Sequence, residues 1–144
     1  GGDISTQNIN FTDNLKCFLN RFDGKLHIVL YCMDPTHLPT LAGLSRAFPN
    51  VSLGAPWWFN DSPYGMKTHF NYVGTVDLLR NHAGFVTDSR KLISFGSRTE
   101  MFRRSLCNVI GNMVEKGQIP MKEARSLVRT LVYERPRELF IFSE

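Results

Sequence analysis

The chain has 144 residues, of which 42% are hydrophobic and 21% charged, and it carries a formal net charge of +4. These fractions fit one globular domain and exclude disordered, fibrous and membrane-spanning classes. Three scattered cysteines without C-x-x-C spacing argue against a disulfide framework or a structural zinc knuckle and favour a reducing compartment.

The first half of the chain alternates helical and strand patterns. Apolar residues recur at helical spacing over residues 11–22, where Asn10 or Thr12 caps the start and Gly24 ends the helix. The near-continuous apolar run 26–33 is typical of a strand buried on both faces. The segments that follow predict a helix over 38–48 and a second strand over 51–55.

The second half repeats the alternation and then becomes helical. A helix is predicted over 66–79, a third strand over 83–87, and long helices over 98–115 and 121–133. Pro136 cannot lie inside a continuing helix, so a new short helix is expected to begin near Arg135.

This order predicts an α/β fold with three parallel strands and flanking helices, formed by residues 1–144 as a single segment. Three parallel strands leave both edges of the sheet unpaired, and unpaired apolar edges favour association. We therefore expect the chain to be the last part of a larger α/β protein.

The loops that follow the strands are the expected place for chemistry. Trp57 and Trp58 follow the second strand, where they either line a pocket for a polar ligand or pack between the strand end and a helix; packing is the favoured alternative. Asn60 and Asp61 are expected to cap the next helix.

Asp88 and Arg90 follow the third strand, two residues apart, so in an extended segment their side chains point the same way. One interpretation makes Asp88 a metal ligand or general base and Arg90 an anion partner. The other, equally weighted, is a helix cap with a local ion pair.

The remaining candidates carry weaker signals. None of the four histidines forms a close ligand pair; His27 is expected in the core, and His37, His69 and His82 at the surface. No phosphate-loop, dinucleotide-binding or serine-hydrolase motif occurs. Basic residues gather on the C-terminal helices, where an ordinary solvated face is favoured over a nucleic-acid surface.

Three linked stretches closely resemble the C-terminal region of the uronate (glucuronate) isomerase family. They are Trp57-Trp58-Phe59-Asn60-Asp61 with Gly65-Met66, then Gly84 to Arg90, then Phe102 to Asn108. Their order and spacing also match, and the likeness runs from about Gly2 to Phe140. Several motifs in register make this resemblance specific.

The resemblance implies a fold and a reaction. The family belongs to the amidohydrolase superfamily of (β/α)8 TIM barrels, and the three strands here would be the sixth to eighth. The implied reaction is aldose–ketose isomerisation of D-glucuronate to D-fructuronate, and of D-galacturonate to D-tagaturonate, through a cis-enediol. The implied setting is cytoplasmic carbohydrate metabolism, with a homo-oligomer, a uronate as the ligand and neither nucleic acid nor membrane as a partner.

The resemblance also implies site residues. Asp88 matches the aspartate after the eighth strand and would be the metal ligand or proton-transfer carboxylate, with a divalent metal, zinc above others. Arg90 would bind a substrate oxygen and stabilise enediolate charge. Trp57 and Trp58 match the family's aromatic pair, of which at least one would line the uronate pocket.

Two departures limit what this segment does by itself. Arg98-Thr99-Glu100 stands where many members have Arg-His-Glu, so no histidine role is expected there. The first five strands, with the remaining metal ligands, are missing, and the segment alone is expected to be inactive. The alternatives are a metal-dependent hydrolase of the same superfamily and a non-catalytic α/β binding module.

Overall fold

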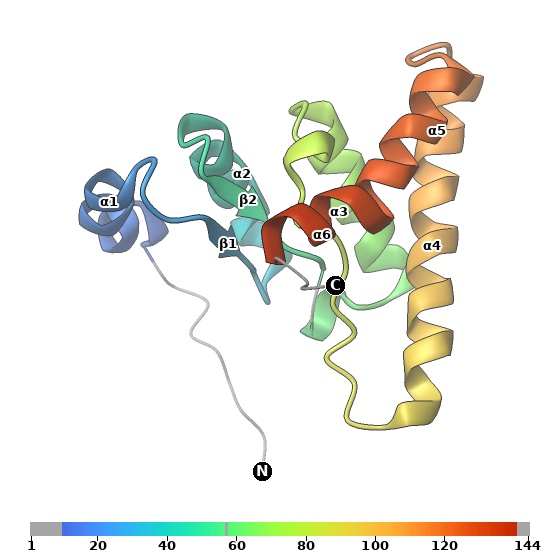
Figure 1. Cartoon of the computed structure of the whole chain (residues 1–144), viewed down its shortest axis with the longest axis horizontal. Helices are drawn as coiled ribbons and strands as arrows, with labels where there is room; N and C mark the ends of the chain where they lie inside the picture. Colours follow the sequence, from blue (N-terminus) through green and yellow to red (C-terminus); the bar gives the residue numbers. More distant parts are fainter. Residues whose placement is uncertain (1–9, 57, 141–144) are drawn as a thin grey trace.

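Two short parallel strands lie between helices in the computed structural model of the chain (Figure 1). The structure describes residues 10–56 and 58–140, with Phe11 and Trp58 described by their backbones alone. The elements are, in order, α1 (Phe11–Phe22), β1 (Ile28–Leu30), the 3-10 turn η1 (Pro35–His37), α2 (Leu38–Ala47), β2 (Val51–Leu53), the 3-10 turn η2 (Trp58–Asn60), α3 (Pro63–Thr75), the 3-10 turn η3 (Leu79–Asn81), α4 (Leu92–Glu115), α5 (Met121–Arg129), the π-helical turn η4 (Thr130–Glu134) and α6 (Arg135–Phe140).

The sheet confirms the predicted parallel pairing of the first two strands. Ile28 lies opposite Val51 and Leu30 opposite Leu53, and the Gly54 amide extends the ladder by donating to the Leu30 carbonyl at 2.8 Å. All three residues of β2 are buried, whereas those of β1 are half-buried. β2 is therefore the inner strand, and β1 has the more open surroundings.

The predicted third strand over 83–87 is not formed as a strand. The Ala83 amide donates to the Leu53 carbonyl at 2.8 Å, which starts a ladder beside β2. The next amide, of Gly84, turns to His82 Nδ1 at 3.1 Å, and Gly84 adopts φ +91°. That left-handed conformation ends the pairing after one hydrogen bond. Within the described residues the sheet therefore has two strands, with the third segment aligned at its edge.

Local sequence signals explain both ends of α1 and the start of α3. The Asn10 side chain accepts from the Asp13 amide at 3.1 Å and caps α1, and Gly24 beyond its end adopts φ +67°. Ser62, rather than Asn60 or Asp61, caps α3 by accepting from the Gly65 amide at 3.0 Å. The cap expected of Asn60 and Asp61 was wrong because both side chains are used elsewhere.

The C-terminal helices also differ from their predicted bounds. α4 begins at Leu92, about two turns before the predicted Arg98. The predicted helix over 121–133 is α5 followed by the π-helical turn η4, and α6 starts at Arg135, where a new helix was expected. The helical backbone is nevertheless continuous from α5 through η4 into α6, so Pro136 does lie within a continuing helix, and the π-helical turn just before it accommodates the residue that lacks an amide hydrogen.

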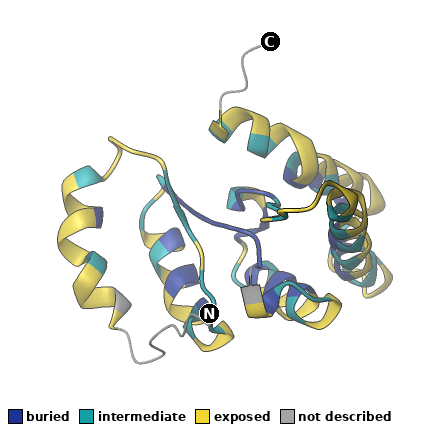
Figure 2. Cartoon of the chain, turned by 90° about the horizontal axis from the view of Figure 1, so that it is seen from below, coloured by how far each residue is buried: buried dark blue, intermediate teal, exposed yellow. Residues whose placement is uncertain are grey.

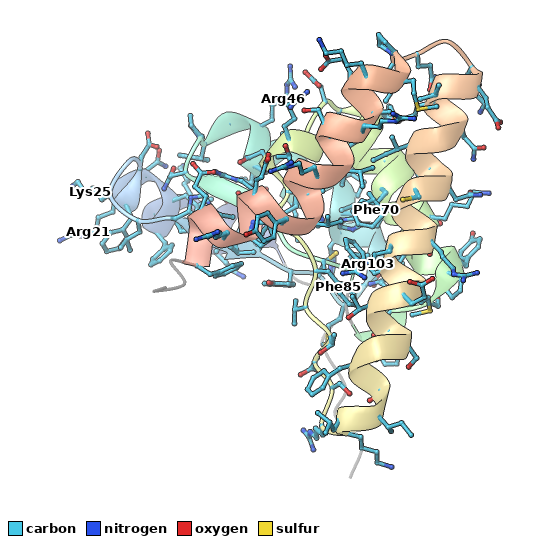
Figure 3. The ribbon with its side chains drawn as sticks, turned by 45° about the vertical axis from the view of Figure 1, so that its right-hand side comes forward. Arg21, Lys25, Arg46, Phe70, Phe85 and Arg103 are labelled. Atoms are coloured by element: carbon cyan, nitrogen blue, oxygen red, sulfur yellow. The ribbon has the colours of Figure 1, made fainter. Side chains whose placement is uncertain are left out.

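Aromatic packing joins the third segment and α3 to α4. The Phe85 ring stacks on Phe102 of α4 with centroids 4.5 Å apart, and Phe70 of α3 lies 5.9 Å from the same ring. Figure 3 shows Phe70 and Phe85 on the side of the molecule that faces α4. Buried positions gather on the inner sides of the helices, and the outer sides are exposed (Figure 2).

A polar network fixes α6 to the amino-terminal half of the sheet. Asn81 of η3 donates to the Val51 carbonyl at 2.8 Å and accepts from Arg135 Nη2 at 3.1 Å and from Ser52 Oγ at 3.1 Å. Ser52 is completely buried, so its hydroxyl needs such a partner. The network brings the last helix beside β2 although the two are far apart in the chain.

Gly84 gives a test of this packing. A Cβ at Gly84 would run into the Pro136 ring and lie 3.2 Å from the Leu131 carbonyl, at a φ that side chains rarely adopt. We expect Gly84→Ala to lower the free energy of unfolding by about 2 kcal/mol or more. Urea unfolding followed by circular dichroism measures it.

Gly96 is the matched control, because it lies in α4 with nothing within 4 Å of a built Cβ. Gly96→Ala should stabilise the chain by up to about 1 kcal/mol. Equal unfolding midpoints for the two variants would contradict the packing described for Gly84.

Candidate active site

Three loops leave the sheet at one edge, because parallel strands place their carboxyl ends together. They are residues 31–37 after β1, residues 54–62 after β2, and residues 84–91, the third segment and its loop. The third segment runs away from the sheet to the N-terminal end of α4 (Figure 1). The candidate site is built from these loops.

Asn60 ties the second loop to the first. It is 8% exposed, and its Nδ2 donates to the carbonyl of Met33 at 2.7 Å and to that of Cys32 at 3.3 Å. Both carbonyls lie just beyond β1, where the chain has left the ladder and needs other donors. Gly65 allows α3 to start directly against η2, since a Cβ there would collide with the Asn60 backbone.

Asp61 ties the second loop to α4. Its Oδ2 forms an ion pair with Arg98 Nη2, and the side chains of Asp61 and Arg98 are 5% and 31% exposed. The other carboxylate oxygen, Oδ1, is buried without a hydrogen-bond partner among the described residues. A carboxylate this buried requires its counter-charge, so the ion pair holds the second loop against α4.

The third loop is tied to the same end of α4. Ser89 Oγ and Ser94 Oγ hydrogen-bond to each other, and the Lys91 carbonyl, 3.1 and 2.8 Å from them, accepts from the hydroxyl that does not donate in this bond. Ser94 and Arg98 are four residues apart on α4, so they lie on one face of the helix. One helix face therefore holds both the second and the third loop.

Asp88 and Arg90 both lie exposed on the third loop. Asp88 adopts φ +46°, a left-handed conformation that aspartate accepts more readily than most residues. The expectation that the two side chains point the same way assumed an extended segment, and the turn at Asp88 removes that basis. Their predicted roles remain predictions.

The structure describes only part of the aromatic pair Trp57 and Trp58. Trp57 lies outside the described residues, and of Trp58 the backbone alone is described, as the first residue of η2. The next residues, Phe59 and Asn60, help to line a cavity of about 330 Å³ between the first two loops, α2 and α3. Its lining also includes Cys32 and Tyr64, and it includes neither Asp88 nor Arg90.

The Cys32 thiol in this cavity is held in its neutral form. Burial and the nearby Asp34 carboxylate raise the pKa of Cys32 to about 11. Asp34 itself accepts from the Thr36 amide at 2.8 Å, which lowers its pKa and caps η1. This end of the cavity therefore holds the capping carboxylate of Asp34 and the neutral thiol of Cys32.

The histidines lie almost opposite to expectation. His27, expected in the core, is exposed and hydrogen-bonds to Ser52 Oγ at 3.0 Å. His69 and His82, expected at the surface, are 6% and 0% exposed, with their Nε2 atoms 3.0 Å apart. The spacing of His69 with Met66, Phe70 and Val73 places it on the apolar face of α3, a signal that the sequence contained.

The hydrogen bonds of the histidine pair assign its protons. The Gly84 amide donates to His82 Nδ1, so the proton of neutral His82 is on Nε2, and His69 Nε2 accepts it. Burial lowers the pKa of His82 to about 4, and burial together with His82 lowers the pKa of His69 well below 6.5. The pair is neutral at pH 7 and joins α3 to the segment that starts the third loop.

The described residues do not build a metal site by themselves. Among residues 10–56 and 58–140 no three His, Cys, Asp or Glu side chains converge on one point. Asp88 offers oxygen ligands of the kind that divalent metals accept, so this part of the chain fits a metal as one ligand of a larger set. In the same residues, no helix is long and apolar enough to cross a membrane.

Comparison with known proteins places this arrangement in a family. The family model described as glucuronate isomerase matches residues 1–140. A uronate isomerase from Thermotoga sp. (strain RQ2) is 67% identical over 140 residues, which are 97% of this chain and 31% of the relative. The chain thus spans about a third of the length of such curated relatives.

Solved structures agree with the sequence comparison. The crystal structure of uronate isomerase from Thermotoga maritima is 66% identical, with a TM-score of 0.95 over 97% of this chain and 31% of that one. Glucuronate isomerase from Caulobacter crescentus is 31% identical, with a TM-score of 0.94 over 100% of this chain and 30% of that one. The fold described above therefore matches about a third of each of these two longer chains.

The buried histidines make stability depend on pH. Between pH 6.5 and about 4 the unfolded chain binds protons that folded His82 and His69 do not, so stability is complete above pH 6.5 and falls as the pH falls. For His82 alone the loss is about 3 kcal/mol. Urea unfolding at several pH values measures this slope.

The variant His69→Gln/His82→Asn keeps an acceptor for the Gly84 amide and removes both imidazoles. It should show a smaller slope between pH 6.5 and 4 than the unvaried chain. The same slope in both proteins would mean that the pair is not held neutral.

Proposed function

Because the chain belongs to the glucuronate isomerase family, we propose that its protein is a uronate isomerase and that this segment forms one side of the active site. The proposed reaction converts D-glucuronate to D-fructuronate and D-galacturonate to D-tagaturonate. The observation that carries the proposal is the family match over residues 1–140, together with the fixed cluster of loops at the carboxyl edge of the sheet.

In this proposal the segment supplies the last strands of a (β/α)8 barrel of the amidohydrolase superfamily. β1, β2 and the third segment would be its sixth to eighth strands. The strands that pair with the two free sides of this sheet and close the barrel would correspond to the part of the relatives that this chain does not span. A homo-oligomer in the cytoplasm is the expected assembly.

The proposed chemistry moves one proton from C2 to C1 and a second from the C2 hydroxyl to the C1 oxygen. A base removes the proton from C2 of the aldose while the C1 carbonyl oxygen is protonated, which gives the cis-enediol. Return of a proton to C1, with loss of the proton from the C2 hydroxyl, leaves the ketose. Aldose and ketose are isomers, so the reaction needs no oxidant or reductant.

We assign the roles of this segment as follows. The Asp88 carboxylate carries the proton or holds a metal, and the Arg90 guanidinium binds a substrate oxygen and balances the negative charge of the enediolate. At least one of Trp57 and Trp58 lines the uronate pocket. The place of Asp88 supports this role, because it is exposed on a loop that Ser89 anchors to α4.

The proposed metal is a divalent ion, and zinc is the preferred candidate. Asp88 would be one of its ligands, and the other ligands would come from outside this chain. A divalent ion bound there would supply Lewis-acid polarisation of a substrate oxygen. This segment's own contribution is to position Asp88 and Arg90.

The test uses a fused protein in which residues 1–144 replace the matching segment of the Thermotoga maritima uronate isomerase. We expect this protein to convert D-glucuronate, and Asp88→Asn to lower turnover at least about 100-fold, because the amide neither accepts the proton nor carries charge. A coupled assay of fructuronate measures the rate.

Asp77→Asn is the matched control, since Asp77 is also exposed and also adopts a positive φ, of 58°. It should leave turnover unchanged. Full activity of folded Asp88→Asn would remove the role given to Asp88.

A further inference from the structure

We infer that Asp61 and Arg98 are positioning residues that hold the three loops of the active site in one arrangement. The inference rests on the proposed function and goes beyond it, because neither residue is assigned a role there. It starts from the ion pair that joins the loop after β2 to α4.

Asp61 is the central link in a chain of contacts. Its neighbour Asn60 donates to the Met33 carbonyl of the first loop at 2.7 Å, while Asp61 itself pairs with Arg98 of α4. One turn before Arg98, Ser94 hydrogen-bonds to Ser89 of the third loop. The first, second and third loops are thus connected through two adjacent residues and one helix face.

The contacts have the burial that a positioning role requires. The Asp61 side chain is 5% exposed and the Asn60 residue 8%, so neither is a solvated surface group whose contacts change freely. By contrast, the ion pair between Arg80 of η3 and Glu123 of α5 joins side chains that are 60% and 52% exposed. Exposed pairs of that kind contribute little, whereas a buried carboxylate depends on its partner.

The link lies between the groups that carry the proposed chemistry. Trp57 and Trp58 precede Asp61 by four and three residues, respectively, and Asp88 and Arg90 flank Ser89. Catalysis of this type depends on geometry, and an error of about 1 Å can cost about 100-fold in rate. Breaking the pair should therefore impair the reaction without removing any group that touches the substrate.

The first measurement uses the 144-residue chain, whose two tryptophans are Trp57 and Trp58. Asp61→Asn should make their fluorescence easier to quench with acrylamide, because the loop that carries them loses its anchor. The control Glu123→Gln breaks the exposed pair and should leave quenching unchanged. Unchanged quenching in Asp61→Asn would overturn the inference whatever the activity of the protein.

The second measurement uses the fused protein defined above. Asp61→Asn should lower kcat/KM for D-glucuronate by about 10- to 100-fold in protein whose melting temperature stays close to that of the unvaried protein. A merely structural pair would lower the melting temperature and leave kcat and KM of the folded fraction as they were. Glu123→Gln should change neither constant.

A double-mutant cycle separates the effect of breaking the Asp61–Arg98 pair from the effect of unfolding the protein. Arg98→Met leaves the buried Asp61 without its counter-charge, so this variant should melt at a lower temperature than Asp61→Asn/Arg98→Met. The double variant should lose no more kcat/KM than Asp61→Asn alone, because both changes break the same link. Additive losses would show two separate roles and overturn the inference.

The two possible failures are distinguishable. If the unvaried fused protein is folded but inactive, the proposed function fails, and the positioning role fails with it. If the unvaried protein is active and Asp61→Asn keeps its full kcat/KM, the positioning role alone is overturned.

Discussion

The parallel pairing of β1 with β2 is the constraint on which the rest of the structure depends. In its register Leu30 lies opposite Leu53, so both strands end side by side at the carboxyl end of the sheet. Asn60 and Asp61 can then contact the first loop and α4 at once, because both loops start from neighbouring points. The site is a consequence of where two three-residue strands end.

The two ends of the sheet are stabilised in different ways. At the amino-terminal half, Asn81, Ser52 and Arg135 bind the last helix to β2 through neutral and charged hydrogen bonds. At the carboxyl edge, Asn60 and the Asp61–Arg98 pair bind loops to one another. A sheet of two short strands is marginal by itself, and β1 is only half-buried.

Sequence reasoning predicted the features that local chemistry determines. The Asn10 cap and the end of α1 before Gly24 each depend on a few adjacent residues. It failed where contacts between distant residues decide. The third segment leaves the ladder at Gly84, which lies against Pro136 and Leu131 of the C-terminal helices, and His82 is buried against His69 of α3. The Asp61–Arg98 pair joins residues 37 positions apart, and no local pattern indicates it.

The most direct test of the central claim compares D-glucuronate isomerisation, in the presence of zinc, by the 144-residue chain alone and by the fused protein that supplies the part the chain does not span. We expect turnover by the fused protein and none by the chain alone, because the segment holds one side of the site. A folded fused protein without turnover would contradict the isomerase proposal. Turnover by the chain alone would contradict the claim that the site needs groups from outside it.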